Sequence, residues 1–206
     1  MRSKGKQKGA GFERKTCKAL SLWVSGGERE DLFWRSAMSG GRATVGRKAG
    51  KEHARHAGDI SSTSPEGHAL TDRWYVECKA YKDLDIVAAF VNGNGKLAKF
   101  WRETVEQATH YKRMPMLIAK QNITPTLVLV PTAHLINPYG SAMYPRARLG
   151  HSDILRADIL DFEGMLKLPF EPRATQIDEQ FLKPGEMARI LGYAKPKRKK
   201  IKRVRL

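Results

Sequence analysis

Apolar and polar residues follow two different periods along this chain, and together they predict an α/β domain. Between residues 11 and 25 apolar positions recur every three or four residues, which predicts an amphipathic helix that Gly26 and Gly27 end. A second helical pattern covers residues 96–113. Shorter runs rich in β-branched and aromatic residues predict strands at 31–37, 58–63, 72–81, 115–120 and 124–130. The last of these is apolar on both faces, so we expect it at the centre of a sheet.

The strand predicted at residues 72–81 carries charge on one face only. Successive side chains of a strand alternate between its two faces. One face therefore holds Trp74, Val76, Cys78 and Ala80, and the other holds Tyr75, Glu77, Lys79 and Tyr81. A half-exposed strand with a neighbouring charge pair would show the same pattern, so the Glu-Cys-Lys triplet needs support from other residues.

Two further acids are expected near this triplet. A turn at residues 63–68 joins the strands at 58–63 and 72–81, so we expect antiparallel pairing to bring Asp59 beside Glu77. Glu13 lies on the inward stripe of the first helix with Cys17, Leu20 and Val24. Carboxylates with water and phosphate oxygens are the ligands that Mg²⁺ prefers, with Mn²⁺ as an alternative. A lysine beside such a site can orient a water and stabilise charge on phosphorus.

These residues resemble the motif of the PD-(D/E)XK nuclease superfamily over about residues 11–131. Its Holliday-junction-resolvase branch from archaea and phages is the most similar, with a helical glutamate and a Ser-Gly loop, here Ser39–Gly41. The resemblance implies a restriction-endonuclease-like α/β fold: a mixed central sheet flanked by helices, in the order α-β-β-β-α-β-β, with a C-terminal extension. It also implies that Asp59, Glu77 and Glu13 hold the metal and that Lys79 acts on the attacking water. One departure is that Gly58, and not proline, precedes Asp59.

Gln107 and Tyr111 form a second match downstream. Their spacing of four residues places them on one face of the predicted helix at 96–113. A Q-x-x-x-Y pair at this place is similar to that of the exonuclease branch of the same superfamily, which gives both residues a supporting role. By spacing alone, a polar and an aromatic residue at a helix edge explain the pair equally well. Other acids near the triplet remain alternatives to those assigned, namely Glu66, Asp72, Asp83 and Asp85.

The charge of the chain identifies a class of partner. Lys and Arg total 38 against 21 acids, a net charge of +17, which attracts polyanions such as DNA. Residues 195–206 hold eight basic residues and no acid, and residues 2–18 and 40–58 form two further basic clusters. We expect a disordered tail that binds phosphate, although a merely solvated tail would have the same composition. The residues predicted to contact DNA are Arg42, Arg47, Lys48, Lys197, Arg198, Lys199, Lys200, Lys202 and Arg203.

Composition also bears on the compartment. No run approaches the roughly 18 apolar residues that cross a bilayer, so a membrane partner is not expected. Cys17 and Cys78 lie in apolar patterns and are interpreted as reduced core residues. We therefore expect a cytoplasmic protein, in the host cytoplasm if a phage encodes it.

The sequence thus predicts a Mg²⁺-dependent DNA endonuclease that acts on branched or duplex DNA, and the resemblance implies a homodimer. The predicted organisation is a nuclease core at 1–131, an accessory segment at 132–194 and the basic tail. Two alternatives stay open: an exonuclease or restriction-type nuclease of the same superfamily, and a basic DNA-binding protein without catalysis. The convergence of three acids and Lys79 favours an enzyme, because a binding surface gains nothing from acids that repel phosphate.

Overall fold

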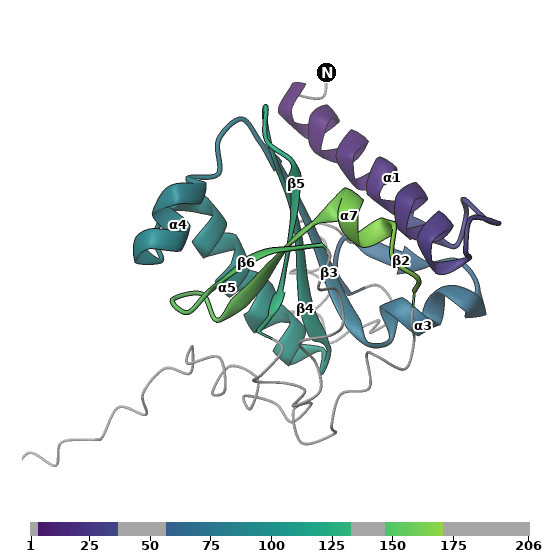
Figure 1. The fold of residues 1–206 in the computed structure, drawn as a ribbon. Helices are drawn as coiled ribbons and strands as arrows, with labels where there is room; N and C mark the ends of the chain where they lie inside the picture. The colour runs from purple at the N-terminus through teal and green to yellow at the C-terminus, as the bar shows by residue number, and fades with distance from the viewer. Residues whose placement is uncertain (1–3, 37–56, 133–146, 171–206) are drawn as a thin grey trace, which may run out of the picture.

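The computed structural model describes residues 4–36, 57–132 and 147–170, which form a mixed sheet covered by helices on both faces (Figure 1). The sheet has five strands in the order β3-β4-β5-β7-β6. β3 (Trp74–Tyr81) runs parallel to β4 (Met114–Gln121), and the other neighbours pair antiparallel. β5 (Thr126–Pro131) is the middle strand, as its apolar sequence predicts. The α/β fold class and the mixed sheet flanked by helices are confirmed.

The two parallel strands are joined by a helical crossover. α4 (Ile86–Asn92) and α5 (Gly95–His110) connect β3 to β4, and α5 packs on the sheet through Leu97, Trp101 and Val105. These three residues recur every fourth position, so they form one face of the helix. The helical pattern at 96–113 therefore predicts α5 well, whereas the short helix α4 was not predicted.

α1 (Lys4–Val24) covers the opposite side of β3, next to the C-terminal α7 (Phe162–Leu166). It begins seven residues before the predicted start. It ends as predicted at the two glycines: Gly27 donates its amide to the carbonyl of Leu22 at 2.7 Å, and both glycines have positive φ. Leu20 and Cys17 are buried against the sheet, which places the inward stripe of the helix as predicted.

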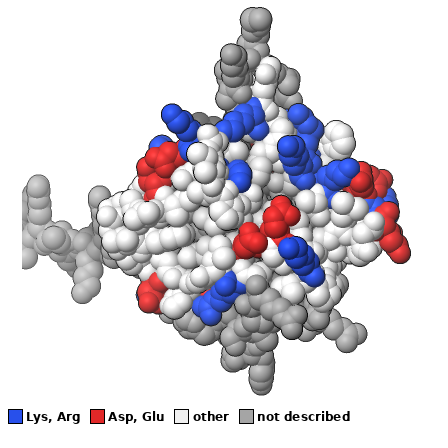
Figure 2. Space-filling view, turned by 45° about the horizontal axis from the view of Figure 1, so that its top comes forward, with Lys and Arg blue, Asp and Glu red and all other residues white. Residues whose placement is uncertain are grey.

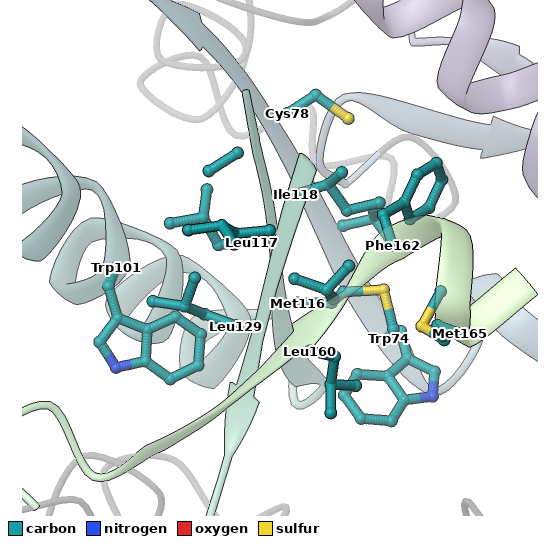
Figure 3. Close-up of a cluster of buried hydrophobic side chains, with 14 of the residues drawn as sticks. Trp74, Cys78, Trp101, Met116, Leu117, Ile118, Leu129, Leu160, Phe162 and Met165 are labelled. Carbon is teal, nitrogen blue, oxygen red and sulfur yellow. The ribbon is translucent and has the colours of Figure 1, made fainter. Parts of the chain in front are cut away.

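The core consists of two layers of apolar side chains, one on each face of the sheet (Figure 3). Leu117 and Leu129 lie with Trp101 of α5 on one face, and Ile118 lies with Phe162 on the other. All five are buried, with 5% exposure at most. Such packing fixes β3 in its place at the edge of the sheet. The outer edge of β3 is where Asp59 binds.

One predicted pairing is wrong. Residues 58–63 do not pair with residues 72–81; β2 (Ile60–Ser62) pairs antiparallel with β1 (Phe33–Arg35) in a separate two-stranded sheet. The reason lies in residues 65–71, which overlap the turn predicted at 63–68. They form a 3₁₀ turn (Pro65–Gly67) followed by the short helix α3 (His68–Thr71), and this segment carries the chain too far for a hairpin.

The described part of the C-terminal segment continues the sheet. β6 (Arg148–Ser152) and β7 (Ala157–Asp161) form an antiparallel pair, and β7 also pairs with β5. The division of the chain at residue 131 stays a prediction. The basic tail and most of the basic cluster at 40–58 lie outside the described residues. Among the described helices, none is long and apolar enough to cross a membrane.

Candidate active site

Asp59 is anchored to the open edge of β3. β3 is the first strand of its sheet, and within the described part of the chain no strand pairs with its outer edge. The amide of Asp59 donates to the carbonyl of Val76 at 2.9 Å, and one carboxylate oxygen of Asp59 accepts from the amide of Cys78 at 2.9 Å. The carbonyl of Asp59 accepts from the amide of Ser36, at the end of β1, at 2.8 Å. The predicted proximity of Asp59 to this strand is therefore present, although no strand ladder produces it.

Gly58 explains why no proline precedes Asp59. Its φ is +86°, whereas the ring of proline holds φ near −65°. A Cβ at this position would also lie 2.6 Å from the backbone oxygen of Val76. Only glycine lets the chain approach β3 this closely in this conformation. The departure from the superfamily pattern thus follows from the path of the backbone.

Glu77 and Lys79 project from the same face of β3, as strand alternation predicts. The ammonium of Lys79 donates to Oε1 of Glu77, and the hydroxyl of Tyr75 donates to Oε2 at 3.2 Å. The side chains of Glu77 and Lys79 are mostly buried, with 18% and 25% exposure. Burial opposes the charge of Lys79, but the carboxylate of Glu77 outweighs it, so the pKa of Lys79 is raised. The lysine is therefore charged at neutral pH.

The ionised form of the Asp59 carboxyl group is disfavoured by its surroundings, and a bound cation would stabilise it. Burial raises its pKa from 3.8 to about 7, and the nearby charge of Glu77 acts in the same direction. The amide of Cys78 and the charge of Lys79 oppose this rise without cancelling it. Two carboxylates held this close repel one another unless a proton or a cation lies between them.

Glu13 faces the same region but is held by an ion pair. Nε of Arg35, on β1, lies 2.5 Å from a carboxylate oxygen of Glu13, whose side chain is 14% exposed. The charge of Glu13 contributes to the raised pKa values of Asp59 and Cys17. Arg35 was not predicted as a site residue; a single arginine in the apolar run at 31–37 is the only signal that the sequence offers.

The donor chemistry fits a divalent cation held by two carboxylates. Asp59 and Glu77 supply hard oxygen ligands, and Mg²⁺ commonly takes one or two carboxylates with water and phosphate. Within the described ranges, no three His, Cys, Asp or Glu side chains converge closely enough to hold an ion. The assignment of Glu13 as a third ligand therefore stays a prediction.

Gln107 and Tyr111 both lie near β3. A cleft of about 290 Å³ between β3 and α5 is lined by Gln107 together with Glu77 and Lys79. The ring of Tyr111 stacks on that of Tyr75, with centroids 5.9 Å apart and planes 10° from parallel. Tyr75 in turn orients Glu77, so Tyr111 supports the site through Tyr75. The catalytic importance of both residues stays a prediction.

The remaining candidates lie elsewhere. Glu66 pairs with Arg29 at 2.8 Å, and Asp85 accepts from the amide of Lys96 at 3.0 Å, so these two acids have structural roles. Figure 2 shows lysine and arginine side chains spread over one face of the molecule, with acidic side chains among them. The predicted DNA contacts Arg42, Arg47 and Lys48, the Ser39–Gly41 loop and all the tail residues lie outside the described residues.

Comparison with known proteins gives one match, to a protein family. The model of the family described as "Phage putative PDDEXK endonuclease" matches residues 4–178 of this chain. The match spans most of the chain and includes Glu13, Asp59, Glu77 and Lys79. No curated protein and no solved structure matches.

Proposed function

This chain belongs to the family of phage PD-(D/E)XK endonucleases, and we propose that it hydrolyses phosphodiester bonds of DNA with the help of Mg²⁺ or Mn²⁺. The observation that carries the proposal is the arrangement of Asp59, Glu77 and Lys79. A buried pair of mutually repelling carboxylates stands beside a charged lysine at the edge of one strand. A surface that only binds DNA has no use for this combination, because the acids repel phosphate.

Asp59 and Glu77 would hold the cation, with Glu13 as a further carboxylate near it. A bound Mg²⁺ supplies positive charge that neutralises phosphate oxygens and lowers the pKa of a water. The chain itself does the positioning. The amide of Cys78 fixes one oxygen of Asp59, and the hydroxyl of Tyr75 fixes one oxygen of Glu77.

Lys79 would place a positive charge beside the phosphate on which negative charge develops during hydrolysis. Its ammonium is held against Glu77 and lies 5.5 Å from the centroid of the Phe100 ring. A fixed, poorly hydrated cation stabilises negative charge on a reacting phosphate far better than a mobile one in water. It also orients a water that attacks phosphorus, which is the role the superfamily resemblance assigns to it.

The expected substrate is structured DNA, such as a four-way junction, and the active form is a homodimer. The resemblance to Holliday-junction resolvases supports both points, since a junction offers two equivalent strands to cut. The net charge of +17 supports DNA over any uncharged polymer. A Q-x-x-x-Y pair beside the cleft favours an exonuclease as the competing activity within the superfamily.

The test is cleavage of labelled four-way junction, linear duplex and single-stranded DNA, with and without Mg²⁺ or Mn²⁺. We expect Asp59→Asn and Lys79→Ala to lower the cleavage rate by about 10²–10⁴-fold. Affinity for DNA in EDTA should stay similar, or rise slightly for Asp59→Asn, because that change removes a negative charge. Asp153→Asn and Lys167→Ala are matched controls, because both side chains are exposed and neither lines the cleft.

The outcomes separate the two classes of function. Cleavage of the junction in preference to duplex supports a structure-specific endonuclease, and shortening of linear DNA from its ends supports an exonuclease. If the unaltered chain binds DNA tightly and cuts none of the substrates with either metal, the enzyme is excluded. The chain is then a binding protein.

A further inference from the structure

The cleft between β3 and α5 has walls that suit a neutral planar ligand, and we propose that it receives one unpaired nucleobase of the DNA substrate. This inference rests on the proposed function in one respect, because it takes DNA as the ligand. It adds a feature of that ligand, namely a base that is extrahelical or otherwise unpaired beside the site of cleavage.

The shape of the cleft sets the size of the ligand. One wall is the face of β3 that carries Tyr75, Glu77 and Lys79. The other wall is one stripe of α5, with Phe100, Glu103, Thr104 and Gln107. The volume of about 290 Å³ lies just below the range for small-molecule pockets, roughly 300–1,000 Å³. It therefore admits one ring system rather than a run of nucleotides.

In the absence of a bound cation, the charge of the cleft disfavours a phosphate as the occupant. Glu77 and Glu103 bring two negative charges, and Lys79 brings one positive charge. The cleft is thus negative, although the whole chain has a net charge of +17. A nucleobase is uncharged at neutral pH, so it enters without the repulsion that a phosphate would meet.

Each wall of the cleft contributes an aromatic ring, Tyr75 from β3 and Phe100 from α5. The Phe100 ring lies below the ammonium of Lys79 and 5.1 Å from the ring of Tyr81, which is 43% exposed. The ring of Tyr75 stacks on that of Tyr111. Contact between a base and aromatic side chains is a common source of affinity for unpaired nucleotides, and it tolerates any base.

The polar groups of the α5 wall add a preference among bases. Glu103 has a side chain that is 53% exposed and only loosely paired with Lys99, at 3.9 Å. Its carboxylate can accept a hydrogen bond from the amino group of cytosine or adenine, which thymine lacks. Gln107, one helical turn further, offers both a donor and an acceptor. We therefore expect an unpaired cytosine or adenine to bind more tightly than an unpaired thymine.

The experiment compares affinities of the full chain for three fluorescently labelled duplexes, measured by anisotropy in EDTA. One duplex is fully paired, one has a single bulged cytosine and one has a single bulged thymine. The cytosine bulge should bind about tenfold more tightly than the paired duplex, which corresponds to the stacking of one base. Phe100→Leu should reduce this ratio to within about twofold of unity. Glu103→Ala should abolish the difference between cytosine and thymine.

Glu106→Ala is the matched control, since Glu106 lies on the same helix outside the cleft and is exposed. It should keep all the wild-type ratios. Equal affinity of the unaltered chain for bulged and paired duplex would overturn the inference, as would ratios that neither cleft variant changes. Because these measurements contain no metal, they do not depend on cleavage. Selective binding without cleavage contradicts the enzyme alone, and cleavage without selective binding contradicts the base site alone.

Discussion

One carboxylate oxygen of Asp59 accepts a hydrogen bond of 2.9 Å from the amide of Cys78, the residue between Glu77 and Lys79. The site is therefore organised by the backbone of β3 as well as by its side chains. The same strand presents Glu77 and Lys79 on one face and uses its open edge to hold Asp59. The position of Asp59 relative to Glu77 and Lys79 is fixed by this contact, by the hydrogen bond from its amide to the carbonyl of Val76 and by the close approach of Gly58.

The raised pKa of Asp59 predicts how the stability of the metal-free protein depends on pH. In the unfolded chain this pKa is near 3.8, and in the folded protein it is about 7. The folded state thus binds the proton more tightly, so the free energy of unfolding should fall as the pH rises from about 4 to 7. Asp59→Asn removes this contribution and should flatten the decline.

Urea denaturation in EDTA at about pH 5 and pH 8 measures the difference. Adding Mg²⁺ at the higher pH should restore stability to the unaltered protein and not to Asp59→Asn, because the cation binds the folded state. If both proteins lose stability equally between the two pH values, the shift does not reside at Asp59.

The ion pair between Arg35 and Glu13 predicts a measurable cost when one partner is lost. Arg35→Met leaves the carboxylate of Glu13, only 14% exposed, without its guanidinium. We expect the free energy of unfolding to fall by about 1–3 kcal/mol. The double variant Arg35→Met with Glu13→Gln should recover part of this loss, because the unpaired charge is gone.

Chemical denaturation of the two single variants and the double variant gives the coupling energy of this pair. The exposed pair of Lys18 and Glu30 is the control, with 58% exposure on both sides. Lys18→Met should change the free energy of unfolding by less than about 1 kcal/mol. If Arg35→Met and Lys18→Met lower the free energy of unfolding equally, the carboxylate of Glu13 is better solvated than its 14% exposure indicates.

Gly58→Ala should destabilise the fold and move Asp59. A Cβ here would lie 2.6 Å from the carbonyl oxygen of Val76, and the φ of +86° is itself unfavourable for alanine. The expected loss is about 2 kcal/mol or more. Gly26→Ala has a comparable φ of +66° and no atom within 4 Å of the added Cβ, so it should lose only about 1 kcal/mol. Denaturation curves of both variants test whether the close approach adds its own cost.

Removal of residues 195–206 should weaken binding to all DNA sequences alike. The eight basic residues of this segment would release counterions from phosphates, so the slope of log affinity against log salt should become shallower. A full-length variant with these eight residues changed to serine separates charge from chain length. Deletion without any change of slope would mean that the tail makes no phosphate contacts.

The sequence predicts which residues of β3 share a face better than it predicts how the backbone brings Asp59 to that strand. Alternation along a strand is a local property, so Glu77 and Lys79 fall on one face as expected. The position of Asp59 depends instead on tertiary contacts between residues far apart in sequence. Pro65 and Gly67 favour a turn, whereas residues 68–71 form a short helix with Leu70 buried, and no strong local pattern predicts this helix. The antiparallel pairing expected from a short turn was wrong for this reason.

Two other features lay beyond local patterns. Arg35 is one of 38 basic residues, and only the packing of α1 on β1 reveals that it meets Glu13. β7 joins the sheet beside β5 from a segment whose apolar runs suited a helix or a strand equally. In both cases the deciding information is which segments meet in space.

The open edge of β3 has a consequence for how two copies of this chain could associate. Because Asp59 occupies that edge, a second copy that extended the sheet would have to pair at the other end, along β6. Five strands from each copy would then separate the two sites by nine interstrand spacings, roughly 43 Å at about 4.8 Å each. An assembly of that kind would hold its two candidate sites roughly 43 Å apart, so it would act on two distant phosphates of one DNA molecule rather than on neighbouring ones.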